Sequence, residues 1–335
     1  QRGGEASGGV PGRPVEGVFL GPEVTRASHP QPHGRRGAAP HGRVDPRRGD
    51  AAVNEDRKGI GGRAVVIEVE AQPVLAVLLE GEAVDNSISV DDKDGIYIVT
   101  SVYMRKVVWD GQKLSEDEAD GAWKTEYDYV PNPAALSRGA GNTPTLLGFG
   151  PDEDKLVVLA DAGDPIKIAA FWRDEIPQDF EQKPGTKSPR IADQLALKIK
   201  VPATIEWSPH VYGNGIMMFA SAFPDPVMQD NGMLAFFESV LTSGVTREAP
   251  IGAEKWSWDT KTRSLKSDWT VDYPLQSALH PVSAASNTVT LAQLKDGVYS
   301  LIHVDWDTGQ EVGRVILGTS PIFNTAGGFI VPIDK

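Results

Sequence analysis

From Val65 onward, apolar and polar residues alternate in short runs bounded by Gly, Pro, Asn and Asp, a pattern typical of β-strands. The first two runs are separated by a Gln-Pro pair and predict a hairpin, and the next three surround a polar turn that ends at Gly95. Together they predict an antiparallel meander. The predicted strands are residues 65–69, 74–79, 86–90, 96–100 and 104–109.

The same order of strands returns along the chain, at intervals of roughly 40 to 70 residues. The longer copies contain loop insertions, and the one candidate helix lies around residues 233–241. Each later copy begins with small or polar residues, such as Ser208-Pro209 or Ser320-Pro321. The later copies span residues 143–172, 208–271, 283–317 and 320–333.

A four-stranded sheet of this size cannot bury both of its faces alone, whereas radial stacking of several such sheets buries them all. The sequence therefore predicts an all-β fold, a β-propeller of four-stranded antiparallel blades, with about five blades visible. The fifth blade would pair outer strands from residues 65–79 with inner strands from residues 320–333. The chain could also be a fragment of a larger propeller, and a pair of β-sandwiches is the alternative fold.

Residues 1–64 differ from the rest of the chain. They contain ten Arg and one Lys, against seven Arg and fifteen Lys in residues 65–335, and they follow neither the strand nor the helix period. We therefore divide the chain into a low-complexity segment, 1–64, and a propeller domain, 65–335. Three interpretations of the segment stay open: a disordered tail, GC-rich DNA translated in a wrong reading frame, or a nucleic-acid-binding arm. The arm would use Arg35, Arg36, Arg43, Arg47 and Arg48.

Composition excludes several classes of site. The chain has no cysteine, so it has no disulfide, thiolate metal site or Cys nucleophile. Its net charge of −13 repels phosphate backbones, and we expect no nucleic-acid partner. No apolar run is long enough to span a membrane, and no signal peptide is visible. We expect a monomer.

Polar residues just before the predicted inner strands are the candidate site. Inner-strand starts converge on the mouth of a propeller channel, where oxygen ligands from several blades could hold calcium. We predict that Asn86 and Glu206 face a common axial cavity and act as metal ligands. The other channel-mouth candidates are Glu82, Asp85, Asn142 and His210. The competing interpretation is that all of them are ordinary solvated loop residues.

Other chemistry has weaker support. His210, His280 and His303 fall on different repeats and could form a metal site, although the position of His303 within a predicted strand indicates a structural role. No Gly-x-Ser-x-Gly motif and no phosphate-binding loop occurs. Whether the protein is an enzyme is left undecided by the sequence.

Two segments resemble the outer-strand repeat of pyrroloquinoline-quinone-type, or quinoprotein-like, propellers. Residues 255–262, followed by Trp269, are one copy, and residues 304–310 are the other. The repeat implies an Asp and a Gly that shape a hairpin turn and a Trp that packs between blades. Arg263 stands in place of the Gly in the first copy, and Gly313 or Arg314 in place of the Trp in the second.

Residues 85–98 are similar to a segment of gluconolactonase-type and strictosidine-synthase-like propellers. That resemblance implies that Asn86 points into the channel, where it can ligate calcium. Residues 143–148 resemble a segment of uncharacterised secreted bacterial propellers, which implies a periplasmic or secreted location.

Two functions follow as hypotheses. In the first, the protein binds a small molecule, a quinone-like ligand or calcium at the channel mouth. In the second, it is a non-catalytic scaffold whose loops, including residues 224–250, bind protein partners.

Overall fold

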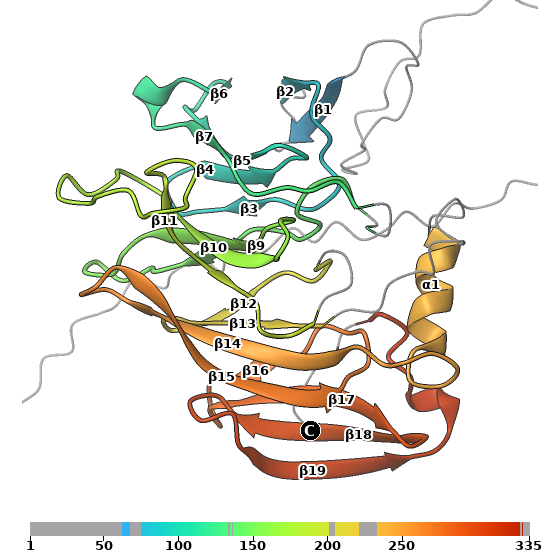
Figure 1. The fold of residues 1–335 in the computed structure, drawn as a ribbon. Helices are drawn as coiled ribbons and strands as arrows, with labels where there is room; N and C mark the ends of the chain where they lie inside the picture. Colours follow the sequence, from blue (N-terminus) through green and yellow to red (C-terminus); the bar gives the residue numbers. More distant parts are fainter. Residues whose placement is uncertain are drawn as a thin grey trace, which may run out of the picture. The chain divides into compact units, whose positions relative to one another are not determined.

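The computed structural model describes residues 62–67, 75–132, 135, 137–200, 205–220, 233–328 and 330, which are almost entirely β-strands and turns (Figure 1). Nearly all of the 1–64 segment, including the five arginines of the hypothetical arm, lies outside the described residues. The first strand, β1, begins at Gly62, three positions before the predicted boundary, and pairs with β2 as an antiparallel hairpin. The two strands are β1 (Gly62–Ile67) and β2 (Leu75–Glu80).

The first full sheet has five strands, because two segments pair with the same strand. Both β6 and β7 are antiparallel partners of β5, one after the other along its length. The sequence predicted the first three strands and missed the last two, which are short and polar. The strands are β3 (Ser89–Val90), β4 (Gly95–Val99), β5 (Tyr103–Trp109), β6 (Leu114–Ser115) and β7 (Trp123–Glu126), with a 3-10 turn, η1 (Glu118–Asp120), between the last two.

Three four-stranded antiparallel sheets follow, each with its strands paired in chain order. In the third, Ser286 and Asn287 form a turn, whereas the sequence predicted a strand there. The strands of the first sheet are β8 (Thr145–Leu147), β9 (Leu156–Ala160), β10 (Lys167–Trp172) and β11 (Ile191–Ala196). Those of the second are β12 (His210–Tyr212), β13 (Gly215–Phe219), β14 (Ile251–Asp259) and β15 (Ser264–Pro274). Those of the third are β16 (Val282–Ser283), β17 (Thr288–Lys295), β18 (Val298–Asp305) and β19 (Glu311–Gly318).

The central sheets bury both faces, which explains their continuous apolar runs. In β9, Leu156 and Val158 point toward the β12–β15 sheet, whereas Val157 and Leu159 point toward the β3–β7 sheet. The same alternation in β13 directs Ile216 and Met218 toward the β8–β11 sheet, and Met217 and Phe219 toward the β16–β19 sheet. Four-stranded meanders that stack face to face in chain order are propeller blades. The fold is therefore all-β, of the β-propeller class, as predicted.

The two segments that resemble an outer-strand repeat, residues 255–262 and 304–310, have the predicted local structure. In each turn an aspartate accepts backbone hydrogen bonds: Asp259 from Lys261 and Thr262, and Asp305 from Asp307 and Thr308. The residue at the glycine position is left-handed in both copies, with φ of +49° at Arg263 and +72° at Gly309.

The repeat tryptophan joins neighbouring sheets. Trp269 of β15 donates through Nε1 to the Trp306 carbonyl in the β18–β19 turn, at 2.9 Å, and both rings belong to one core. The prediction that this tryptophan packs between blades is confirmed.

The predicted fifth blade differs from the structure. Residues 320–323, expected to start an inner strand, form the 3-10 turn η3 (Pro321–Phe323), in which the Ser320 side chain accepts from the Ile322 amide. Pro321 cannot donate to a strand ladder, and this favours the first turn of a helix. Among the described strands, β1 and β2 pair only with each other, and residues 331–333 lie outside the described part of the chain.

Helix α1 (Met233–Thr242) confirms the single predicted helix and lies in the connection between β13 and β14 (Figure 1). Its C-terminal turn is held by backbone bonds that run from Ser243 to Ser239 and from Thr246 to Thr242. No helix among the described residues combines the length and apolar character that a membrane span requires.

Candidate functional site

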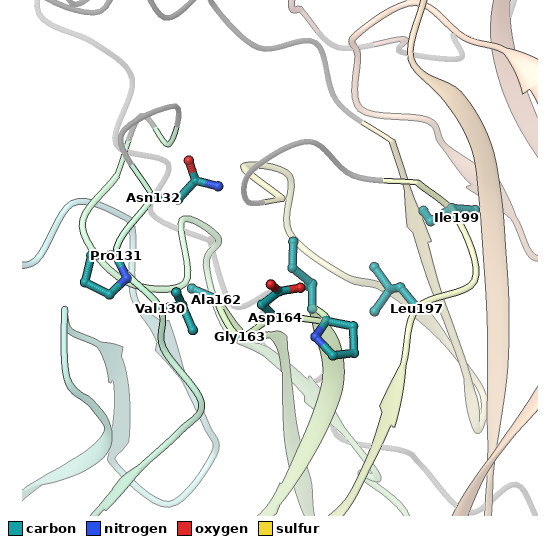
Figure 2. A pocket seen from close by; sticks show the side chains of 10 residues that line it. Val130, Pro131, Asn132, Ala162, Gly163, Asp164, Leu197 and Ile199 are labelled. Atoms are coloured by element: carbon teal, nitrogen blue, oxygen red, sulfur yellow. The ribbon is translucent and has the colours of Figure 1, made fainter.

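A cavity of about 300 Å³ lies where three connecting segments of the propeller meet (Figure 2). Residues 130–132 follow β7, residues 162–166 connect β9 to β10, and residues 197–199 follow β11. Seven of the ten described residues that line it have apolar side chains, and the Asn132 amide and the Asp164 carboxylate are the polar ones, while polar atoms form more of the wall surface than apolar atoms do. The apolar lining consists of Val130, Pro131, Ala162, Pro165, Ile166, Leu197 and Ile199.

Backbone pairing holds the three segments together. Tyr129 and Ala162 form a parallel bridge, in which the Val130 amide donates to the Ala162 carbonyl at 2.8 Å and the Ala162 amide donates to the Asp128 carbonyl at 3.0 Å. The Leu197 amide donates to the Ile166 carbonyl at 3.0 Å. Because these bonds are formed by the main chain, the cavity wall is built before any ligand binds.

The buried Asp161 carboxyl shapes the β9–β10 connection. Its Oδ1 accepts from the Gly163 amide at 3.1 Å and from the Lys167 amide at 2.7 Å, while Oδ2 has no hydrogen-bond partner among the described residues. Burial raises the pKa of Asp161 to about 6, although the Lys167 and Gly163 amides and the Lys167 ammonium oppose the shift. Lys167 Nζ lies 3.7 Å from Oδ2 and also pairs with Asp128. Asp161 therefore holds the loop that carries Asp164.

Two of the predicted channel-mouth residues meet on one segment, residues 137–142. Glu206 accepts a hydrogen bond from the Ser137 hydroxyl at 2.9 Å and lies against Gly141, where a Cβ would be 2.9 Å from its carboxylate oxygens. Asn142 is fully buried three residues before β8. Its Nδ2 donates to the carbonyls of three residues and its Oδ1 accepts from the Ala160 amide. The three carbonyl partners are Ala140, Ala160 and Ile205.

These contacts make Asn142 a structural residue. The amide oxygen that a cation would need is bonded to Ala160, and the amide hydrogens tie the β8–β11 sheet to the segment that leads into β12.

The remaining predicted residues lie in the connection between β2 and β3. Asp85 pairs with Arg138, whose Nη2 lies 3.2 Å from Oδ1, so it contacts the same 137–142 segment as Glu206. Glu82 is buried, and both of its carboxylate oxygens accept from the Arg105 guanidinium, one of them from Nε at 2.9 Å. Asn86 is half-buried just before β3. That Asn86 and Glu206 share a cavity stays a prediction.

The three histidines pack against aromatic rings or hydrogen-bond within the sheets. Phe219 lies between His210 and His280, with ring centroids 5.2 Å and 4.4 Å away, and burial lowers the pKa of His210 to about 4 and that of His280 to about 3. His280 Nδ1 accepts from the Ala292 amide at 3.3 Å. His303 lies within β18, 3.0 Å from the Thr290 hydroxyl, as expected of a structural histidine. Within the described ranges, no three His, Asp or Glu side chains are grouped to hold a metal ion.

Sequence reasoning missed the cavity. Asn132 and Asp164 belong to connections, and neither precedes an inner strand. The available signal was the Asp-Ala-Gly-Asp-Pro sequence at 161–165, which is longer than a tight hairpin between β9 and β10 needs. That signal predicts a loop, but the other two walls come from distant segments.

Comparison with known proteins finds one curated relative, itself uncharacterised. No family model matches it. An uncharacterised protein of Archaeoglobus fulgidus is 28% identical over 254 residues, which cover 73% of this chain and 47% of the archaeal protein. The chain thus spans about half the length of that curated relative.

Several solved structures are distantly similar. The Nup133 β-propeller domain of Vanderwaltozyma polyspora matches at 11% identity and a TM-score of 0.39, over 74% of this chain and 66% of that one. A quinohemoprotein alcohol dehydrogenase of Pseudomonas putida HK5 matches at 9% identity and a TM-score of 0.39, over 71% and 34%. Saccharomyces cerevisiae Sqt1 matches at 10% identity and a TM-score of 0.37, over 70% and 48%. These scores carry no information about activity, and the fold class rests on the sheets themselves.

Proposed function

We propose that the protein binds a small molecule in the cavity between residues 130–132, 162–166 and 197–199. The observation that carries this proposal is a preformed cavity whose wall combines apolar side chains with one carboxylate and one amide (Figure 2). Ligand sites in proteins combine apolar side chains with a few polar groups, and about 300 Å³ is at the small end of their range. The ligand is therefore of metabolite size, with both apolar and polar groups.

The polar groups define the other end of the ligand. Asp164 is exposed at the cavity and offers acceptor oxygens, and the net charge of −13 adds to the attraction of a cation at this carboxylate. A ligand with an ammonium group or another hydrogen-bond donor fits this arrangement. A pyrroloquinoline quinone carries carboxylates, and Asp164 would repel it, so this cavity gives no support to a quinone ligand.

The test is a thermal-shift screen of small aliphatic and aromatic amines, followed by calorimetry on the best binder. Asp164→Asn should weaken binding about tenfold or more, the loss of about 1.4 kcal/mol or more that a charged hydrogen bond supplies. Asp152→Asn is the matched control, because Asp152 is an exposed turn aspartate at the other end of β9. Equal affinity of the wild type and Asp164→Asn, or no amine that binds, refutes the proposal.

Calcium binding at the inner-strand starts is a second candidate. It is favoured by residues 137–142, which contact Asp85 through Arg138 and Glu206 through Ser137. In this hypothesis Glu206 and Asn86 supply oxygen ligands. Native mass spectra with and without a chelator should show a calcium adduct that Glu206→Gln loses. Identical spectra of the wild type with and without the chelator remove this candidate.

A scaffold that binds protein partners is the third candidate, favoured by helix α1. Leu234, Phe237 and Leu241 are spaced three and four residues apart, which places them on one face of the helix, and their exposed fractions are 75%, 42% and 49%. Apolar anchors at this spacing are what a hydrophobic groove on a partner recognises. A partner cross-linked at position 237 should be lost with Leu234→Asp, and equal capture by the two proteins contradicts the scaffold.

A further inference from the structure

The Arg173 guanidinium is buried at the end of β10 without enough acceptors. Arg173 is only 2% exposed, and its Nη2 donates a hydrogen bond to the Gly148 carbonyl at 2.9 Å. Nε and Nη1 are also buried, and neither has a hydrogen-bond partner among the described residues. Three N–H groups of a permanent cation therefore point at no acceptor.

Two other arginines, the buried Arg105 and the half-buried Arg190, have hydrogen-bond acceptors. Arg105 pairs with Glu82 and Glu116. Arg190 donates to the Trp172 and Asp174 carbonyls. No carboxylate of the described residues forms an ion pair with Arg173, and the face of the Phe149 ring lies 5.1 Å from its guanidinium carbon. Leaving a charged donor buried and unpaired costs several kcal/mol, so a missing acceptor is expected at this position.

A cavity of about 240 Å³ lies beside the guanidinium, although Nε and Nη1 themselves have almost no accessible surface. Arg173 lines it, together with two lysines and the β8–β9 turn. Lys155 is half-buried, and its ammonium donates to the Gly150 carbonyl. Lys93 also lines the cavity and belongs to the β3–β4 turn. The cavity therefore brings three cationic side chains from two neighbouring sheets together.

Acidic residues also line this cavity, but most of their oxygens are already bonded. The Asp174 oxygens accept from Lys106 at 3.0 Å and from Lys93 at 3.2 Å. Burial alone would raise the pKa of Asp174, yet the two ammonium groups lower it below its usual value. Asp91 accepts from the Tyr97 hydroxyl and from the Lys93 and Gly95 amides. Asp92 is exposed to solvent.

We propose that this cavity is an oxyanion site: the exposed Phe149 ring moves aside, and the phosphate or carboxylate group of a small molecule then binds Nε and Nη1 of Arg173, with Lys155 beside it. Arginine matches planar and tetrahedral oxyanions in geometry as well as charge. The site goes beyond the proposed amine cavity: the two lie at opposite ends of β10, roughly 20 Å apart for a six-residue strand. Failure of one proposal therefore leaves the other intact.

Inorganic phosphate is the probe for the experiment, titrated by calorimetry and by thermal unfolding at constant ionic strength with chloride as the replaced anion. The wild type should show saturable binding and a melting temperature that rises by several degrees. Arg173→Met keeps the apolar stem and should weaken phosphate binding at least tenfold. Arg138→Met is the control with unchanged phosphate affinity, since Arg138 is exposed and pairs with Asp85.

A second variant, Phe149→Glu, tests the proposal even if Arg173→Met fails to fold. Phe149 is 63% exposed and lies over the guanidinium, so Phe149→Glu supplies a carboxylate in place of the ligand. This variant should melt at a higher temperature than the wild type without phosphate, and phosphate should no longer shift its melting temperature.

Further titrations separate the sources of the anion. If glycerol 3-phosphate binds more tightly than inorganic phosphate, the natural ligand carries a phosphate group. If acetate binds with the same affinity as inorganic phosphate, the natural ligand carries a carboxylate. The proposal is overturned if the wild type shows no saturable binding of any of the three anions. It is also overturned if Phe149→Glu still responds to phosphate as the wild type does.

Discussion

Replacing Asn142 with alanine tests the role that the structure assigns to this residue. The amide is completely buried and connects the start of β8 to the end of β9 and to Ile205, which leads into the next sheet. If Asn142 were a solvated ligand at a channel mouth, its removal would change stability little. If it is a structural link, its removal should destabilise the protein strongly.

The magnitude follows from the bonds that are lost. Asn142→Ala leaves the Ala160 N–H buried without an acceptor, which costs about 1–3 kcal/mol. It also removes both amide hydrogens, which serve three carbonyls, at about 1 kcal/mol for each hydrogen. We expect a total loss of about 3–5 kcal/mol, a large part of the ~5–15 kcal/mol that stabilises an ordinary domain.

Urea unfolding followed by tryptophan fluorescence measures this loss, because the chain contains eight tryptophans. Asn214→Ala is the control: this side chain is exposed in the β12–β13 turn, and its replacement should cost less than about 0.5 kcal/mol. A loss of less than about 1 kcal/mol for Asn142→Ala refutes the structural assignment and returns the residue to the list of candidate ligands.

Three further changes test the packing and the buried charges. Gly309→Ala should lower the free energy of unfolding, measured in urea, by about 2–4 kcal/mol, because φ is +72° and the new Cβ would lie 2.7 Å from Trp269. Gly297→Ala is the control: φ is +75° but the space is open, so the loss should be only about 1 kcal/mol. Equal losses for the two variants would contradict the clash with Trp269. His280 has a folded pKa of about 3, below its unfolded value of 6.5, so its stabilising contribution is complete above pH 6.5 and falls by up to about 1.4 kcal/mol per pH unit below it. His280→Asn should flatten the stability profile between pH 6.5 and 4, and an unchanged slope would show that another group titrates. The effect of Asp161 on stability has the opposite pH dependence, since its folded pKa of about 6 lies above the unfolded value of 3.8. In urea unfolding, Asp161→Asn should therefore be about 1–3 kcal/mol more stable than the wild type at pH 8 and lose that advantage near pH 4. A variant that is less stable than the wild type at pH 8 contradicts the burial argument.

Strands with strong apolar patterns were predictable from the sequence, and polar ones were not. The runs at β9, β10 and β13 are apolar at nearly every position, because each strand is covered on both faces. Strands β7 and β11 mix Lys, Glu, Asp and Gln with buried residues such as Trp123 and Ile191, and they pair with open edges of β5 and β10. Such short mixed runs give only a weak local strand pattern.

The candidate site was predicted only in part. The inner-strand starts do carry polar residues, but whether Asn142 binds a ligand or a backbone carbonyl depends on atoms supplied by Ala160 and Ile205. The Arg173 site has no sequence signature either. An arginine after an apolar strand normally reaches solvent or a carboxylate, and its lack of a partner becomes visible only when its surroundings are known.

The sequence by itself determined the apolar strands, many of the turns and the class of fold, because hydrophobic alternation and turn residues act over a few neighbouring positions. The turn at Asp305 and the left-handed conformation of Gly309 are local in this sense. Only the tertiary structure decided which faces meet, where cavities remain and which polar groups lack partners. Those properties depend on atoms brought together from distant segments, such as 130–132, 162–166 and 197–199. Contacts between such segments produce no periodic pattern in the sequence.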